Sequence, residues 1–154
     1  MIVEATPEEI DELFPLWLEL MQQHQRLHKV FKCKPNHENT LKTELLKRIR
    51  EKGTKVFAYE QEGNWIGMII CTIRQSVNGF ELSRKGYIAE TIVKEAYRHK
   101  GIGKELFEAA RNWLQDNGAD HLELQVSVKN PGAVNFWEGI GFSTSTQHMV
   151  MVLK

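Results

Sequence analysis

Residues 98–104 place several basic side chains and two glycines at the start of an amphipathic helical pattern. The basic side chains are Arg98, His99, Lys100 and Lys104, and the glycines are Gly101 and Gly103. The first backbone N–H groups of a helix have no partner inside the helix and lie at the positive end of its dipole. Glycine lets a bulky anion approach the backbone without meeting a Cβ. This stretch is therefore a candidate phosphate-binding turn.

A second interpretation of the same residues stays open. Two glycines between a strand and a helix also suit a plain tight turn with a solvated basic rim. The turn lacks the third glycine of the dinucleotide-binding G-x-G-x-x-G fingerprint. It also lacks the four-residue spacing and the Lys-Ser/Thr pair of a Walker loop. A phosphate-binding turn here would belong to a different class.

The elements beside the turn are predicted by hydrophobic periodicity. Residues 86–95 are predicted to form a strand, with apolar residues on both faces as in a central strand covered on both sides. Alternation assigns one face to Tyr87, Ala89, Thr91 and Val93, and the other to Ile88, Glu90 and Ile92. The following helix should bury Leu106, Ala110, Trp113 and Leu114, and should end near Asn117-Gly118.

The remaining elements are predicted from caps, turns and spacing. Thr6, Pro7 and Glu9 form a capping-box helix start, and Pro15 is expected to kink or restart that helix. Strands are predicted at 1–5, 55–61, 65–75 and 121–128, and a closing strand or strand pair is predicted over 143–154. Helices are predicted after residue 6, near 39–51 and within 130–142. The sequence thus predicts an α+β fold.

Composition predicts a single globular domain over 1–154, with 42% hydrophobic residues and 20 basic against 20 acidic residues. This balance gives no reason to expect a nucleic acid or a membrane surface as a partner, so a basic site must be local. No run of 18 apolar residues predicts a membrane span, and no signal-peptide pattern is visible. A cytoplasmic location is the resulting expectation.

The cysteines and a histidine pair suggest further chemistry. Cys33 lies in a polar stretch and Cys71 in an apolar run; a disulfide between them stays open, but a reducing compartment is the plainer interpretation. His24 and His28 have the i, i+4 spacing of metal ligands, but no third ligand is evident. We expect no metal site, and a plain surface position is the simplest interpretation of both histidines.

Two segments carry a family resemblance. Residues 97–107 resemble motif A of the GNAT superfamily of acetyl-CoA-dependent N-acetyltransferases, Q/R-x-x-G-x-G/A, with Arg98, Gly101 and Gly103 at its defining positions. Residues 128–142 are similar to the family's N-x-x-A-x-x-F-Y-x-x-x-G-F. The matching residues there are Asn130, Ala133, Phe136, Gly141 and Phe142. The resemblance covers nearly the whole chain and is most specific over 86–142.

The resemblance implies a GNAT-like α+β fold, with a mostly antiparallel mixed sheet of about six to seven strands and about four helices. It implies acetyl transfer from acetyl-CoA to a primary amine by direct attack in a ternary complex, without a metal. The acceptor stays open among polyamine, amino acid, peptide amino terminus, aminoglycoside and lysine side chain. Because the family often dimerises, a homodimer is one expected arrangement.

The resemblance also assigns coenzyme-binding residues. The pyrophosphate would lie on the backbone N–H groups of Arg98, His99, Lys100, Gly101, Ile102, Gly103 and Lys104. The pantetheine arm would pair like a strand beside Thr91, Ile92 and Val93, and would meet Asn130 and Ala133. Asn130, followed by Pro131, is equally well placed as a helix cap.

A lysine-like acceptor amine has a pKa of about 10.4, so at neutral pH its ammonium form must lose a proton before the amine attacks. Glu90 is the first candidate for the base, although a glutamate in a strand also suits a plain salt bridge. Glu123 and Gln125 share one face of the next strand, and some relatives have glutamate where Gln125 stands. A backbone N–H of Ile92 or Val93 would hold the oxyanion.

The general acid is where this sequence departs from the family pattern. Trp137 occupies the usual tyrosine position, and an indole N–H is not an acid at neutral pH. Water, Tyr87 or Ser127 would then protonate the departing thiolate. The alternative is a module that binds acyl-CoA for regulation with little turnover. A nucleotide-binding role ranks third.

Overall fold

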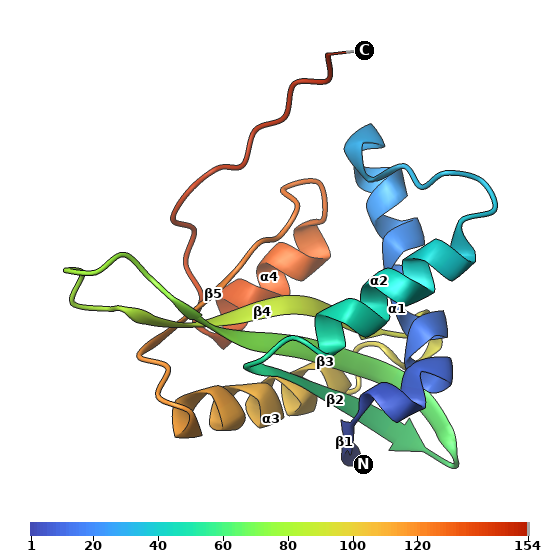
Figure 1. The fold of residues 1–154 in the computed structure, drawn as a ribbon, viewed down its shortest axis with the longest axis horizontal. Coiled ribbons are helices and arrows are strands. Elements are labelled where there is room, and N and C mark those ends of the chain that lie inside the picture. Colours follow the sequence, from blue (N-terminus) through green and yellow to red (C-terminus); the bar gives the residue numbers. More distant parts are fainter. Residues whose placement is uncertain (154) are drawn as a thin grey trace.

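The computed structural model describes residues 1–153 and has helices on both faces of one sheet (Figure 1). Five strands lie in chain order: β1 (Ile2–Ala5), β2 (Thr54–Gln61), β3 (Asn64–Gln75), β4 (Arg84–Val93) and β5 (His121–Leu124). β1 to β4 are antiparallel, and β5 runs parallel to β4. The helices are α1 (Ile10–Leu27), α2 (Glu38–Ile49), α3 (Ile102–Asp116) and α4 (Pro131–Ile140). Short 3-10 turns are η1 (Pro7–Glu9), η2 (Lys29–Phe31) and η3 (Glu95–Tyr97).

The predicted α+β class is confirmed, but the predicted sheet is too large. The structure has five strands instead of six to seven, because residues 143–153 form no strand and extend away from the body (Figure 1). The strand expected over 121–128 ends at Leu124. Its pairing with β4 runs only from Lys85 opposite His121 to Ile88 opposite Leu124, so the residues beyond Leu124 have no ladder to join.

A β-bulge in β4 changes which side chains share a face. Ile70 pairs with Glu90 while Cys71 pairs with Ile88, which leaves Ala89 as an extra residue without a partner on β3. Ile88 packs in the cluster under α3, whereas Ala89 and Ile92 pack in the cluster under α1 and α2. The prediction that Ile88, Glu90 and Ile92 share one face was therefore wrong.

Two hydrophobic clusters cover the two faces of the sheet. The cluster under α1 and α2 includes Leu13, Leu16, Leu20 and Leu45, together with Met68 and Ile70 of β3. The cluster under α3 and α4 includes Leu106, Phe107, Ala110, Leu114 and Trp137, together with Ile69 and Cys71 of β3. The central strands are thus buried on both sides, as their apolar composition predicts.

Local signals in the sequence account for most element ends. Thr6 and Glu9 form the predicted capping box, although the first turn is 3-10. The helix α1 continues through Pro15 from Ile10 to Leu27, so no restart occurs. The β2–β3 hairpin turns at Glu62 and Gly63, both with positive φ, as a two-residue primed turn requires. Among residues 1–153, no helix is both long and apolar enough to cross a membrane.

Candidate active site

The second half of β4 has an open edge on the side of β5. β4 continues to Val93 along β3, but its pairing with β5 stops at Ile88. Past the bulge, hydrogen-bonded pairs alternate along an antiparallel ladder. Because Lys94 N donates to Ile66 O at 2.8 Å, the backbone groups of Ile92 also face β3. Those of Thr91 and Val93 therefore face the open edge, where an extended chain can pair with them.

The turn after β4 presents a series of unused backbone donors. Within residues 1–153, the N–H groups of 99–104 donate to no protein acceptor, and the first helical bond is from Glu105 N to Gly101 O. His99 and Gly101 have positive φ, which turns successive N–H groups toward one side as in an anion-binding nest. A Cβ on Gly101 would meet nothing within 4 Å, so the space in front of the turn is open.

The open edge and the turn are joined directly. The Nε of Arg98 donates to the carbonyl oxygen of Val93 at 2.8 Å, which fixes the turn against the strand end. Gly103 lies on the inner side of the turn, where a Cβ would approach the Phe136 ring to 3.3 Å and the Val93 side chain to 3.9 Å. Packing against α4, rather than room for a ligand, therefore explains the small residue at 103.

The side chains of the turn divide into outer and inner ones. His99, Lys100 and Lys104 are exposed and available to an anion, and the Lys100 ammonium also lies 5.7 Å from the centre of the Tyr97 ring. The Ile102 side chain is buried in the cluster under α3, so only its backbone can serve a ligand. Part of the Arg98 guanidinium is already used by Val93.

The start of α4 lies beside this region. Asn130 caps α4, since its Oδ1 accepts from the backbone N of Ala133 at 3.2 Å. The capping interpretation of Asn130 is therefore confirmed, and the cap uses the N–H of Ala133. The Thr91 hydroxyl is a further unused group: it is buried and has no hydrogen-bond partner within residues 1–153. An orphaned hydroxyl beside an open strand edge suits a polar, extended ligand.

Glu90 lies on the α1/α2 side of β4 in a salt bridge, as its alternative interpretation predicts, although the partner Arg48 was not predicted. Arg48 of α2 donates from Nη1 to Glu90 Oε1 at 2.8 Å, and the Glu90 side chain is only 10% exposed. The Arg48 guanidinium also lies 5.8 Å from the centre of the Trp17 ring. Nothing in the periodicity of α2 marks Arg48, because the contact depends on the bulge at Ala89.

Burial is the main influence on the titration of this carboxylate. It raises the pKa of Glu90, while the Arg48 cation and the Trp17 indole act in the opposite direction. The pKa of Tyr87 is also raised, first by burial, against the lowering effect of Arg74. Glu90 and Glu123 raise it further. Glu90 is thus a carboxylate that accepts a proton more readily than usual, and Tyr87 is a neutral phenol near it at pH 7.

Trp137 lies in an aromatic cluster away from Glu90. Its ring centre is 4.8 Å from that of Phe136, 5.8 Å from that of Phe107 and 5.6 Å from that of Phe142. The Trp137 side chain belongs to the core under α3, on the opposite face of the sheet. Its catalytic role stays a prediction, with a packing role now visible beside it.

The other residues singled out in the sequence have ordinary partners. His28 accepts from Val30 N through Nδ1 at 3.0 Å, and the His24 ring lies 5.2 Å from that of Phe31. Cys33 and Cys71 are both free. Within residues 1–153, no three or more His, Cys, Asp or Glu side chains gather as a metal site would require. Glu123 contacts His121 and Lys85, and this pairing lowers the pKa of its carboxyl.

This arrangement can hold a ligand with two parts. An anionic group would use the N–H donors of 99–104 and the cations beside them, and an extended amide chain would use the backbone groups of Thr91 and the N–H of Val93. A cationic group could approach Glu90 from the α1/α2 side. Proton transfer between that group and Glu90 is the chemistry that the buried carboxylate favours.

Comparisons with known proteins identify the family and the fold of the chain. The sequence profile of the Acetyltransferase (GNAT) family matches residues 15–142. N-alpha-acetyltransferase 30 of Saccharomyces cerevisiae is 36% identical over 77 residues, which are 50% of this chain and 42% of that relative. The chain thus spans less than half the length of this relative.

Two solved structures share the fold over almost their whole length. The tetramutant of the BH1408 protein from Bacillus halodurans has a TM-score of 0.86 at 20% identity, covering 99% of both chains. The aminoglycoside N-acetyltransferase AAC(6')-Iy in complex with CoA has a TM-score of 0.74 at 17% identity, covering 100% of this chain and 99% of that one. At these identities the likeness concerns the fold alone.

Proposed function

The chain belongs to the acetyltransferase (GNAT) family, and on this premise we propose that it transfers an acetyl group from acetyl-CoA to a primary amine. The observation that carries the proposal is the continuity between the free N–H groups of 99–104 and the open edge of β4. Coenzyme A contains a pyrophosphate followed by an extended amide chain, and these two parts match the two features in order. The orphaned hydroxyl of Thr91 supports the same placement.

Glu90 acts as the base in this proposal. Its buried carboxylate binds a proton more readily than an exposed one, as the direction of its pKa shift indicates. An acceptor amine arrives as an ammonium ion, which can take the place that the Arg48 guanidinium holds beside Glu90. Arg48 is therefore proposed to neutralise Glu90 until the acceptor enters.

The thioester would lie at the open edge of β4, near Val93. The Val93 N–H faces that edge and is our candidate for stabilising the oxyanion, whereas the backbone of Ile92 faces β3. Tyr87 lies on the same face as Glu90 and is protonated at neutral pH, so it is the better candidate than Trp137 for protonating the thiolate. Ser127 and water stay as alternatives.

The acceptor remains to be identified by experiment. A relative named N-alpha-acetyltransferase and a fold neighbour named aminoglycoside N-acetyltransferase suggest peptide amino termini and aminoglycosides as the first amines to test. The assay measures thiol release from acetyl-CoA with an amino-terminally free peptide, kanamycin, spermidine and lysine. Turnover with any of them supports the proposal.

A regulatory module that binds acyl-CoA without turnover is the second candidate. It is favoured by one observation, the burial of Trp137 in an aromatic cluster where a catalytic acid is expected. CoA binding measured by calorimetry together with no thiol release across the panel would favour this module. Failure to bind CoA would contradict both candidates.

A further inference from the structure

A hollow lined by cations, here called the basic hollow, lies at the end of α1. It has a volume of about 930 Å³, and its lining includes the basic side chains of Arg26, Lys29, Lys32 and Lys129. The other lining residues are two glutamines, a leucine and a histidine, so none is acidic. Among residues 1–153, no carboxylate lies within salt-bridge distance of these four cations. Their charges are therefore unbalanced locally, although the chain has 20 basic and 20 acidic residues.

Two separate segments form the walls of the basic hollow. One wall is the end of α1 with η2, and the other is the β5–α4 loop, residues 125–130 (Figure 1). Gln25 Oε1 accepts from the backbone N of Cys33 at 2.8 Å, which ties the residues after η2 back to α1. In the other wall, Ser127 Oγ accepts from the backbone N of Lys129 at 3.1 Å. Hydrogen bonds thus shape both walls.

Stabilisation of α1 by cations at its carboxyl end does not account for the whole set. Such cations interact favourably with the helix dipole, which suits Arg26 in the last turn of α1. Lys32 follows η2, however, and Lys129 comes from the β5–α4 loop. Like charges from separate segments repel one another, so gathering them costs free energy unless a negative group joins them. The arrangement therefore suits an anionic ligand.

The basic hollow lies further along the helix that borders the Glu90 site. Arg48, which pairs with Glu90, lies 5.8 Å from the centre of the Trp17 ring on α1. Since α1 rises about 1.5 Å per residue, the hollow begins about 7.5 Å beyond Trp17 at Gln22 and reaches Arg26 about 13.5 Å beyond it. An extended peptide covers these distances in about two to four residues. A peptide with its amino terminus at Glu90 would then have about its third to fifth residues at the hollow.

We propose that the acceptor is a peptide with a free amino terminus and acidic residues at about its third to fifth positions, which the basic hollow binds. This inference rests on the proposed acetyl transfer with Glu90 as the base. A single acidic amino acid is too short to reach both places, because one residue spans only about 3.5 Å. Kanamycin and spermidine are polycations, so the four cations of the hollow would repel them.

The first test compares two hexapeptides that differ only in charge. Both have a free amino terminus; one has glutamate at its third, fourth and fifth positions, and the other has glutamine there. We expect the wild type to acetylate the acidic peptide with a kcat/KM more than about tenfold higher, mainly through a lower KM. Added salt should reduce this preference, because the four cations are exposed.

The second test removes one cation from each wall. Lys29→Gln with Lys129→Gln should lower the preference for the acidic peptide by at least about threefold. Both side chains are exposed, so the fold should be unchanged by circular dichroism. The matched control is Lys47→Gln with Lys52→Gln, two exposed lysines outside the hollow, which should keep the preference. Calorimetric titration of CoA should give the same affinity for the wild type and both variants.

A binding measurement separates the basic hollow from the chemistry. The acidic hexapeptide with an acetylated amino terminus cannot react, and calorimetry should show that it binds the wild type more tightly than Lys29→Gln with Lys129→Gln. Equal kcat/KM for the acidic and neutral peptides would overturn this inference and leave the proposed acetyl transfer in place. No turnover with any amine would instead overturn the acetyl transfer, and with it the acceptor role of the hollow. A loss of CoA affinity in the Lys29→Gln, Lys129→Gln variant would assign these cations to the coenzyme and would also overturn the inference.

Discussion

At position 90 a carboxylate is buried beside a guanidinium, and burial and this cation act on its pKa in opposite directions. Burial raises the pKa of Glu90, and Arg48 opposes that rise. In the proposed reaction both features serve the base: burial helps Glu90 to hold a proton, and an ammonium substrate can replace the Arg48 cation. The two features make separate predictions.

Glu90→Gln should lower kcat by about 10²–10⁴, because a glutamine cannot accept the proton of the acceptor amine. CoA affinity should be unchanged. The proposed coenzyme site uses the turn and the open edge of β4 on the side of β5, whereas the Glu90 side chain points toward α2. Glu123→Gln is the matched control: its carboxyl has a lowered pKa from its contact with His121, so it is a poor base and its loss should matter little. Steady-state thiol release measures both variants; equal losses would exclude Glu90 as the specific base.

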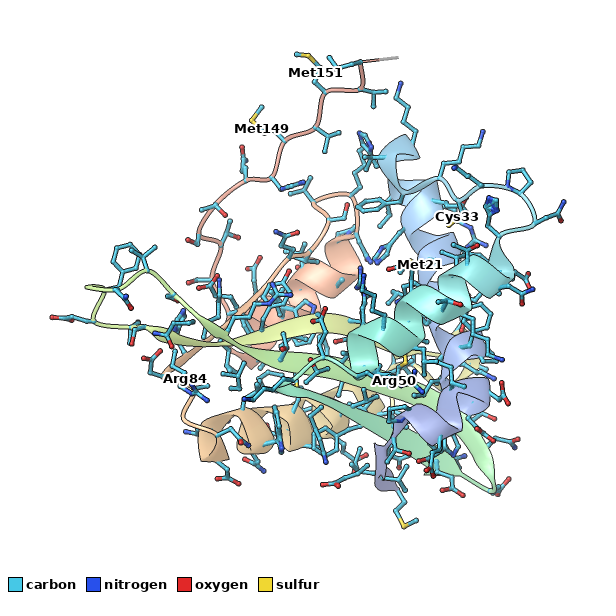
Figure 2. The ribbon with its side chains drawn as sticks, in the orientation of Figure 1. Met21, Cys33, Arg50, Arg84, Met149 and Met151 are labelled. Atoms are coloured by element: carbon cyan, nitrogen blue, oxygen red, sulfur yellow. The ribbon has the colours of Figure 1, made fainter. Side chains whose placement is uncertain are left out.

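Arg48→Gln should shift the acid limb of the pH–rate profile to higher pH. The sign follows from the contact: Arg48 lowers the pKa of Glu90, so its removal lets burial raise that pKa further. Because the base works when deprotonated, more alkaline conditions are then needed. Arg50→Gln is the control, an exposed arginine at the end of α2 (Figure 2). An acid limb that stays in place would separate Arg48 from the chemistry.

At the scale of elements, a cluster of side chains joins the starts of β4 and β5. Asp120 accepts from the backbone N of Ser83 at 2.9 Å and of Arg84 at 3.1 Å, and its other oxygen lies 2.7 Å from His121 Nδ1. The hydrogen bond from His121 lowers the pKa of Asp120 to about 2, and Asp120 in turn raises the pKa of His121. This cluster joins the starts of β4 and β5, at the end of their ladder opposite to the one from which the strands diverge.

His121→Gln should reduce stability in a pH-dependent way. The raised pKa of His121 means that its contribution is full below the ordinary value of 6.5 and is lost as pH rises through the folded pKa. The pKa values of Asp120 and Glu123 are lowered, so the stabilising contribution of these two carboxylates is full above about pH 4.5 and is lost as the pH falls. The difference in melting temperature from wild type should therefore be largest between about pH 4.5 and 6.5, and should stay small because the groups are partly exposed to solvent. His148→Gln, at an exposed histidine outside this cluster, is the control. A difference in melting temperature that does not depend on pH would contradict the role given to His121.

The sequence predicted the elements that have local signals. The capping box at Thr6, the turn at Gly63 and the turn before α3 each depend on residues adjacent in the chain, so their types were sufficient. The bulge at Ala89 depends on how β4 pairs with β3, and no residue type near it in the sequence predicts a bulge. For that reason the Arg48 contact was missed and the face of Ile88 was predicted wrongly.

The sequence pattern also fails for residues 143–153, for which it predicts a strand that the structure does not have. Alternating apolar residues predict a strand over 143–154, but a strand exists only where an edge accepts it. No such edge pairs with residues 143–153 in the single chain. The alternation of apolar residues alone does not show which strand edge, if any, these residues pair with.

At the scale of the whole molecule, one sheet separates two hydrophobic clusters, and we propose that they form a single cooperative domain. Leu16 lies in the cluster under α1 and α2, and Leu106 in the cluster under α3 and α4; both are fully buried. Leu16→Ala and Leu106→Ala should each lower the free energy of unfolding by about 2–5 kcal/mol. A single denaturant transition should persist in both variants, with effects that add within about 0.5 kcal/mol. Two separate transitions would contradict the single domain.

The proposed coenzyme site combines the end of β4 with the turn that follows it, so one substitution in that turn tests the site. Gly101→Glu places a carboxylate in the open space before the N–H groups of 99–104, where it would repel a phosphate. Gly63→Glu is a closely matched control: its φ of 79° is near the 84° of Gly101, and its Cβ also meets nothing within 4 Å. Both changes carry the same backbone strain, so only the position differs.

The most direct test is a calorimetric titration of CoA into the wild type and these two variants. We predict that the wild type and Gly63→Glu bind CoA with the same affinity, and that Gly101→Glu loses binding by more than about a hundredfold while keeping its fold. If Gly101→Glu bound CoA as tightly as Gly63→Glu, the 98–104 turn would not be the pyrophosphate site. The function proposed from that turn would then lose its basis.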